Sequence, residues 1–167
     1  VGIYVNSIHD VDFKDKQYTI NLWLWLKYRR SEFDFSKYLE VPSAKTVDKS
    51  FYTVDTLDDG RIYMMMKLIC IMKDSWKIQH FPFDRQKLRF TIENSQYGAG
   101  DLIFVEDTAG QHYSKWTSVG WHVIDGSFKI GTQVKSYETA FGDPSITTPY
   151  SEFSVFKVTV CIESAEV

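Results

Sequence analysis

Trp23 and Trp25 are the residues whose type and spacing best indicate a binding surface. They alternate with Leu22, Leu24 and Leu26, so both indoles lie on the polar face of a strand whose other face is fully apolar. Indoles on such a face leave apolar surface in water unless something covers them, and their π faces attract cations. Two explanations weigh equally: a loop of the same chain covers the pair, or the pair forms a subunit interface or an aromatic wall for a ligand.

Carboxylates at Asp10, Asp12 and Asp15 have part of the spacing of a calcium-binding loop. Asp15 stands at the sixth position, where such loops carry glycine, and Asn21 stands where the closing glutamate belongs. We therefore expect a solvated turn and neither a metal nor another cofactor. The alternative is a weak calcium site completed by a neighbouring chain.

Signatures of catalysis are absent from the sequence. It contains no G-x-S-x-G nucleophile turn, no P-loop lysine motif, no H-E-x-x-H and no C-x-x-C. The histidines at positions 9, 80, 112 and 122 are scattered without the spacing of metal ligands. An enzyme is therefore not expected.

Length and composition indicate one domain, residues 1–167, with a mass of 19.5 kDa. The net charge is −3 and no basic run is longer than Arg29-Arg30, which argues against a nucleic-acid partner. Apolar stretches such as Met64–Met72, which Lys67 interrupts, are shorter than the roughly 20 residues that span a bilayer. Aromatic residues make up 16% of the chain, a content that favours strands and recognition surfaces.

A period of two dominates the chain. Tyr18–Tyr28, Leu88–Glu93 and Phe156–Glu163 each alternate apolar with polar residues, as half-buried strands of an antiparallel sheet do. No segment shows the apolar stripe of a helix. About ten strands with short turns predict an all-β fold, a two-sheet antiparallel β-sandwich of the immunoglobulin-like kind.

The turn Asp58-Asp59-Gly60 predicts a hairpin between strands over Phe51–Leu57 and Arg61–Lys73. In the second strand Cys70 shares its parity with the apolar residues, so we expect it to be buried. Cys161 shares its parity with polar residues and is expected to face outward. Both are therefore expected to be free thiols.

Phe81-Pro82-Phe83-Asp84 is a strong turn signal and a candidate for a cis peptide bond. Exposing such an apolar loop tip to water is costly, which indicates that the loop packs against another surface. The carboxylate of Asp84 is suited to hold the loop backbone through accepted hydrogen bonds. We expect the loop from Trp76 to Pro82 to project from one end of the sandwich.

Together with Arg85 and Gln86, this loop resembles the signature loop of the pentameric ligand-gated ion channels, the Cys-loop receptor superfamily. The resemblance covers essentially the whole chain in the right order. Asp74 and Leu88 occupy the positions of the loop cysteines of vertebrate members, so the sequence resembles the prokaryotic, cysteine-free branch. The other matching segments are Asn6-Ser7-Ile8 with Asp10 and Asp12, Asn21-Leu22-Trp23-Leu24, Gly120-Trp121, and Pro149-Tyr150 with the strand to Ile162.

The resemblance implies a ligand site between neighbouring subunits. On the complementary face it places Trp23, Trp25, Tyr63 and Met65. In loops B and C it places Glu93, Ser95, Gln96, Tyr97, Phe141 and Tyr150, with Glu40–Lys45 in loop A. It also implies a gating interface toward a membrane domain, formed by Asp12, Phe13, Lys14, Asp15, Phe81, Pro82, Phe83 and Asp84.

The function implied is that of the extracellular or periplasmic ligand-binding domain of a bacterial pentameric ligand-gated ion channel, an inner-membrane protein in full length. Its partners are identical subunits in a homopentamer, a small-molecule or ion ligand, and its own transmembrane domain. Two alternatives stay open. One is a soluble secreted pentameric binding protein of the same fold, and the other is a carbohydrate-binding sandwich with Trp23 and Trp25 as a sugar platform.

Overall fold

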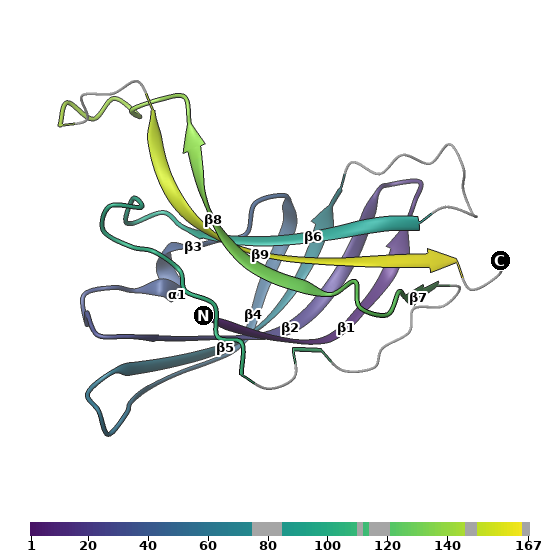
Figure 1. The fold of residues 1–167 in the computed structure, drawn as a ribbon, viewed down its shortest axis with the longest axis horizontal. Helices are drawn as coiled ribbons and strands as arrows, with labels where there is room; N and C mark the ends of the chain where they lie inside the picture. The colour runs from purple at the N-terminus through teal and green to yellow at the C-terminus, as the bar shows by residue number, and fades with distance from the viewer. Residues whose placement is uncertain (75–84, 110–111, 114–120, 146–149, 165–167) are drawn as a thin grey trace.

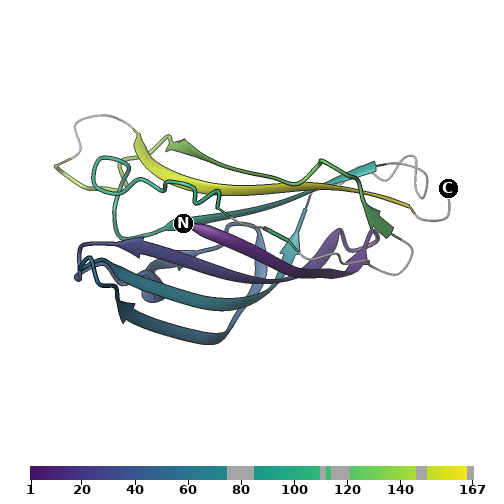
Figure 2. The same cartoon turned by 60° about the horizontal axis from the view of Figure 1, so that its bottom comes forward.

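Two antiparallel sheets pack face to face in the computed structural model, which describes residues 1–74, 85–109, 112–113, 121–145 and 150–164 (Figures 1 and 2). The first sheet has the strand order β1-β2-β5-β4, and the second has the order β3-β6-β9-β7, with β8 also paired to β9. The all-β sandwich expected from the period of two is therefore confirmed. The elements are β1 (Gly2–Asp12), β2 (Gln17–Tyr28), α1 (Phe35–Tyr38), β3 (Leu39–Glu40), β4 (Ala44–Thr56), β5 (Ile62–Lys73), β6 (Arg85–Asn94), β7 (Trp121–Val123), β8 (Lys129–Tyr137) and β9 (Ser151–Ser164).

The core lies between the sheets, and in its central strands buried residues alternate with more exposed ones. In β2 and β5 every second residue is buried, and the register sets Leu22 opposite Leu68 and Leu24 opposite Met66. The second sheet contributes Phe90 from β6 and further apolar residues from β9. Each large apolar side chain buried in this way stabilises the fold by about 1.5–3 kcal/mol. Because successive side chains of a strand point to opposite faces, burial of the leucines of β2 places Trp23 and Trp25 on its outward face.

The hairpin expected at residues 58–60 joins β4 to β5. Gly60 has a φ of 84°, a left-handed conformation that glycine adopts without steric cost. The Asp59 carboxylate accepts a hydrogen bond from the backbone N–H of Arg61 at 2.9 Å. β4 starts at Ala44, earlier than the Phe51 start expected from sequence. Most of its residues are exposed on both faces, so no apolar alternation marks the beginning of the strand.

β9 is the strand around which the second sheet is organised. One edge of β9 pairs with β6. The other edge pairs with β8 along residues 151–159 and then with β7 along residues 162–164. Figure 1 shows β8 and the beginning of β9 bending away from the rest of the sandwich. The start of β9 and the end of β8 therefore form one end of the molecule.

The two cysteines lie on the faces that the parity predicts. Cys70 is buried in the core, and Cys161 is half-buried on the outward face of β9; both are free thiols. Among the described segments, no helix has the length and apolar character needed to cross a membrane. The loop from Trp76 to Pro82, expected to project from one end, lies outside the residues that the structure describes.

Candidate functional site

A hollow of about 1020 Å³ opens at the end of the second sheet where β8 ends and β9 begins. We call it the end pocket. Its walls come from β3, the end of β6 with the loop that follows, the end of β8, and the segment around the start of β9. The lining residues are Glu40, Glu93, Asn94, Ser95, Gln96, Tyr97, Gly98, Ala99, Gly100, Asp101, Tyr137, Ala140, Phe141, Asp143, Ser145, Tyr150, Ser151, Glu152 and Phe153.

Glu93 is the buried carboxylate of the end pocket, with only 4% of its surface exposed. Both of its carboxylate oxygens accept from the Tyr137 hydroxyl, at 3.0 and 2.8 Å. Burial raises the pKa of the Tyr137 phenol above its ordinary value, and the adjoining Glu93 raises it further. Glu40 pairs with Glu93 in the β3–β6 register, so a second carboxylate stands on the neighbouring strand.

Asn94 shapes the loop that follows β6. Its side-chain carbonyl oxygen accepts hydrogen bonds from the backbone N–H groups of Gln96 and Tyr97, at 3.1 and 2.7 Å. Its side-chain NH₂ donates to the backbone carbonyl of Tyr97 at 3.1 Å. Asparagine folds turns in this way because its short side chain reaches the backbone two and three residues ahead. The turn sets Gln96 and Tyr97 on the wall of the pocket.

Three aromatic rings lie together beside the buried carboxylate. The ring centroids of Tyr137 and Phe153 are 5.9 Å apart, those of Tyr137 and Phe141 are 6.0 Å apart, and those of Phe141 and Phe153 are 6.4 Å apart. Each pair meets edge to face. Aromatic ring faces carry partial negative charge and attract cations.

The polar chemistry of the end pocket is one-sided. The described residues that line it include five carboxylates and no lysine or arginine. Oε1 of Gln96 is buried and has no hydrogen-bond partner among the described residues. Lys135 lies 4.8 Å from the centroid of the Tyr137 ring, but it does not line the pocket. Acceptors, negative charge and ring faces together suit a cation that donates hydrogen bonds.

All six residues that the sequence analysis assigned to loops B and C line the end pocket. Glu40 from the expected loop A lies there too. Sequence reasoning missed Tyr137 and Phe153, which complete the aromatic cluster. Phe153 has the outward parity of β9, so an aromatic residue at that position was the available signal. Tyr137 carries no comparable signal, because its strand is exposed along most of its length.

The other four assigned residues lie apart from the pocket, on the outward face of the first sheet. We call this surface the aromatic face. Trp25 pairs with Met65 across β2 and β5, and the Tyr63 hydroxyl lies 3.5 Å from the Met65 sulfur. Trp23 meets Phe51 of β4 edge to face, with ring centroids 5.5 Å apart. Lys67 lies 5.5 Å from the centroid of the Trp23 ring.

The two indoles are half-buried within their own chain. The Nε1–H of Trp25 donates to the Asp107 carboxylate at 3.1 Å, and a Cβ added at Gly2 would lie 2.2 Å from the indole ring. The segment around Asp107 therefore covers part of Trp25. Trp23 is contacted by side chains of its own sheet, Phe51 and Lys67. The remaining surface of both indoles is open to a partner.

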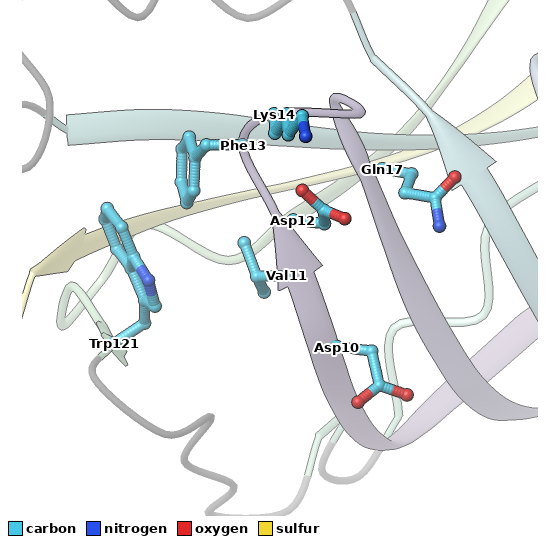
Figure 3. Close-up of a pocket in the computed structure, with 7 residues that line it drawn as sticks. All are labelled: Asp10, Val11, Asp12, Phe13, Lys14, Gln17 and Trp121. Carbon is cyan, nitrogen blue, oxygen red and sulfur yellow. The ribbon is translucent and has the colours of Figure 1, made fainter.

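The turn between β1 and β2 lies at the opposite end of β9 from the end pocket. Phe13 of this turn is buried and stacks on Trp121 with ring centroids 4.4 Å apart, and Figure 3 shows the two rings facing each other. Lys14 and Asp15 are exposed, and Asp12 is half-buried. Phe13 thus packs within the domain, and the exposed part of the expected gating interface on this turn is Lys14 and Asp15. Residues 81–84 lie outside the described residues.

Of the three carboxylates expected on a turn, Asp10 and Asp12 lie at the end of β1, and Asp15 lies on the turn that follows it. The Asp12 carboxylate accepts a hydrogen bond from the backbone N–H of Asp15 at 3.1 Å, and this bond lowers the pKa of Asp12 below its ordinary value. No group of three or more His, Cys, Asp or Glu side chains with metal-site geometry occurs in the described ranges.

No protein-family model matches the chain, and no curated protein matches its sequence.

Proposed function

We propose that this chain is the extracellular or periplasmic ligand-binding domain of a bacterial pentameric ligand-gated ion channel, and that the end pocket binds an organic cation such as an amine. The full-length protein is then an inner-membrane homopentamer whose subunits each carry this domain above their own transmembrane domain.

One observation carries the proposal. Residues that the resemblance assigned to three separate loops meet in a single pocket: Glu40, the segment from Glu93 to Tyr97, and the segment around Phe141 and Tyr150. These segments are far apart in the sequence, and composition alone gives no reason for them to converge. The resemblance does give one.

The chemistry of the pocket supports a cationic ligand. Glu93 supplies a buried negative charge, and a cation over one ring face of the cluster formed by Tyr137, Phe141 and Phe153 would gain about 0.5–2 kcal/mol of cation–π attraction. The unpartnered Oε1 of Gln96 offers an acceptor for an N–H group. An anion entering this pocket would meet five carboxylates and no basic residue among the described lining.

Identical subunits around a ring would let the two surfaces meet. The end pocket belongs to the second sheet and the aromatic face to the first, so one subunit presents both to different neighbours. Trp23 and Trp25 are the side chains by which a neighbour completes the site. Ligand bound there favours one quaternary arrangement, and that shift in population reaches the pore through the turns at the far end.

Electrophysiology of the full-length protein tests the proposal. Primary and quaternary amines are applied to wild type and to Glu93→Gln, with Glu138→Gln as the control, an exposed carboxylate outside the pocket lining. We expect an amine to open the channel and Glu93→Gln to raise the concentration for half-maximal current at least tenfold, while Glu138→Gln leaves it unchanged. Currents that are indifferent to amines, or equal shifts in both variants, would overturn the cation site.

The alternatives give different results. A soluble binding protein of this fold binds the amine without conducting, and its gene encodes no apolar helices after this domain. A carbohydrate-binding sandwich binds immobilised glycans, and the Trp23→Ala variant no longer binds them. Conduction that is sensitive to Glu93 excludes both.

A further inference from the structure

A second hollow, of about 510 Å³, has the opposite chemistry to the end pocket. It lies where the loop before β4 and the end of β5 meet the outward face of β6, β9 and β8. Its lining residues are Pro42, Ser43, Lys73, Asp74, Arg89, Thr91, Gln133 and Lys157. We call it the lateral pocket. Three basic side chains line it against one carboxylate, in a chain whose net charge is −3.

Lys157 is the central cation of the lateral pocket. It is half-buried, and no other described residue forms a hydrogen bond or ion pair with its ammonium group. It pairs with Thr91 of β6 on one side and with Gly131 of β8 on the other. A Cβ added at Gly131 would meet nothing within 4 Å, so the space on that side of Lys157 is open. The charge of this ammonium group is therefore not balanced by a described residue, and an anion in the open space would balance it.

Arg89 lies two residues before Thr91 on the same face of β6, diagonal to Lys157 and within reach of a long side chain. Asp74 accepts from its Nη1 at 3.2 Å, which orients the guanidinium and uses one of its five N–H donors. The Tyr18 hydroxyl, from the first sheet, donates to the Arg89 backbone carbonyl at 2.5 Å. This bond anchors the backbone of β6 at Arg89 to the first sheet.

The wall opposite Lys157 is fixed as well. The backbone N–H of Lys73 donates to the Ser43 carbonyl at 2.8 Å, and the N–H of Asp74 donates to the Lys16 carbonyl at 3.0 Å. Within the described part of the chain, the Lys73 ammonium donates a hydrogen bond to a neutral group, the Asp15 carbonyl at 3.4 Å, and this contact does not balance its charge. Of the three cations, Arg89 alone forms an ion pair with a described residue.

We infer that the lateral pocket is a binding site for a phosphate group. Two uncompensated ammonium groups and an oriented guanidinium approach from different sides, with Thr91, Ser43 and Gln133 as neutral donors. A phosphate carries up to two negative charges and acceptors in several directions, which matches this arrangement better than a singly charged planar carboxylate. The inference does not depend on the ligand of the end pocket.

Calorimetric titration of the full-length protein with inorganic phosphate tests the inference, with ionic strength held constant by potassium chloride. Soluble dioctanoyl phosphatidic acid, a lipid with a phosphate monoester headgroup, is titrated in parallel, below its micelle concentration. The comparison of the two probes distinguishes a free phosphate ion from the phosphate of a lipid headgroup. We expect saturable binding of at least one of the two probes.

Two pairs of variants locate the binding. Lys157→Gln should weaken it about tenfold or more, while Lys129→Gln, on the same sheet face outside the pocket, should not. Gln133→Glu adds a carboxylate at an exposed position of the pocket and should also weaken binding about tenfold. Thr132→Glu adds the same charge one residue away, on the other face of β8, and is its control. The Gln133 pair keeps the test valid if Lys157→Gln fails to fold.

Binding that falls in Lys157→Gln and Gln133→Glu, and is retained in both controls, supports the site. Binding of neither probe to wild type overturns it. Equal losses in test and control variants would show that a general positive surface binds the phosphate, and would overturn it too.

Discussion

The hydroxyl of Tyr137, at the end of β8, donates to both carboxylate oxygens of Glu93, at the end of β6. β9 lies between these two strands. The contact therefore joins two strands that are not neighbours in the sheet, at the point where the end pocket opens. The Glu93 carboxylate, which belongs to the proposed cation site, therefore also holds the ends of β6 and β8 together.

Removing the donor of this contact should destabilise the protein. Tyr137→Phe leaves the buried Glu93 carboxylate without the hydroxyl, and we expect the free energy of unfolding to fall by about 1–2 kcal/mol. Glu93→Gln should cost less, because the amide oxygen still accepts and no buried charge remains. Urea unfolding at pH 7 measures both. A Tyr137→Phe variant as stable as wild type would contradict the structural role of this contact.

The Trp25–Asp107 contact should make part of the stability depend on pH. The Trp25 hydrogen bond and then the Ala109 N–H lower the pKa of Asp107. A carboxyl group with a lowered folded-state pKa stabilises the fold above its unfolded pKa of about 3.9, and this contribution disappears as the pH falls through the folded value. Asp107→Asn should therefore be less stable than wild type at pH 7, by under about 1 kcal/mol because Asp107 is only half-buried, and this difference in the free energy of unfolding should shrink at pH 3.

Urea unfolding followed by tryptophan fluorescence measures this difference at the two pH values. Asp58→Asn, at an exposed position of the β4–β5 turn, serves as the control. A difference between Asp107→Asn and wild type that is the same at pH 7 and pH 3 would contradict the prediction.

Gly2 and Gly131 should respond differently to alanine. The indole of Trp25 occupies the space where a Cβ at Gly2 would lie, so Gly2→Ala must displace the ring and should cost about 1–3 kcal/mol. At Gly131 a Cβ meets nothing, and alanine in a strand is favoured over glycine by roughly 0.5–1 kcal/mol. Thermal unfolding compares the two variants, and near-ultraviolet circular dichroism reports the Trp25 environment. Equal effects of both substitutions would show that Trp25 does not rest on Gly2.

The two thiols should differ in reactivity. Burial raises the pKa of the Cys70 thiol to about 12, so the reactive thiolate is scarce and inaccessible in the folded protein. Cys161 is half-buried on the outward face of β9. We expect a chromogenic disulfide reagent to modify one thiol per chain in the native protein and two in urea, and to modify none in native Cys161→Ser. Rapid native modification of Cys70 would place it outside the core.

The period of two was sufficient to predict β2, β5, β6 and β9, because each of these strands has one face in the core. It also predicted correctly that Trp23 and Trp25 face away from the core. It could not delimit β4 or β8, since a strand exposed along most of its length carries no alternation in hydropathy.

The end pocket was accessible from sequence only in part. Its loop residues were named through the resemblance, but the contact between Tyr137 and Glu93 spans 44 positions. This contact depends on the register between β8 and β9 and on where both strands bend. A local sequence pattern predicts neither of these. The lateral pocket was missed for the same reason: Lys73, Arg89 and Lys157 come from three strands, and only the packing of the two sheets brings them together.

Strand β9 contributes residues to both pockets. It carries Phe153 in the end pocket, Lys157 in the lateral pocket and Glu163 near its far end, where Glu163 contacts Arg85 and His122. β9 has 14 residues and therefore extends over at most about 46 Å. Lys157 lies near its middle, between the residues of the end pocket and the turns at the far end. An anion bound in the lateral pocket would contact the middle of this strand and neither of its ends.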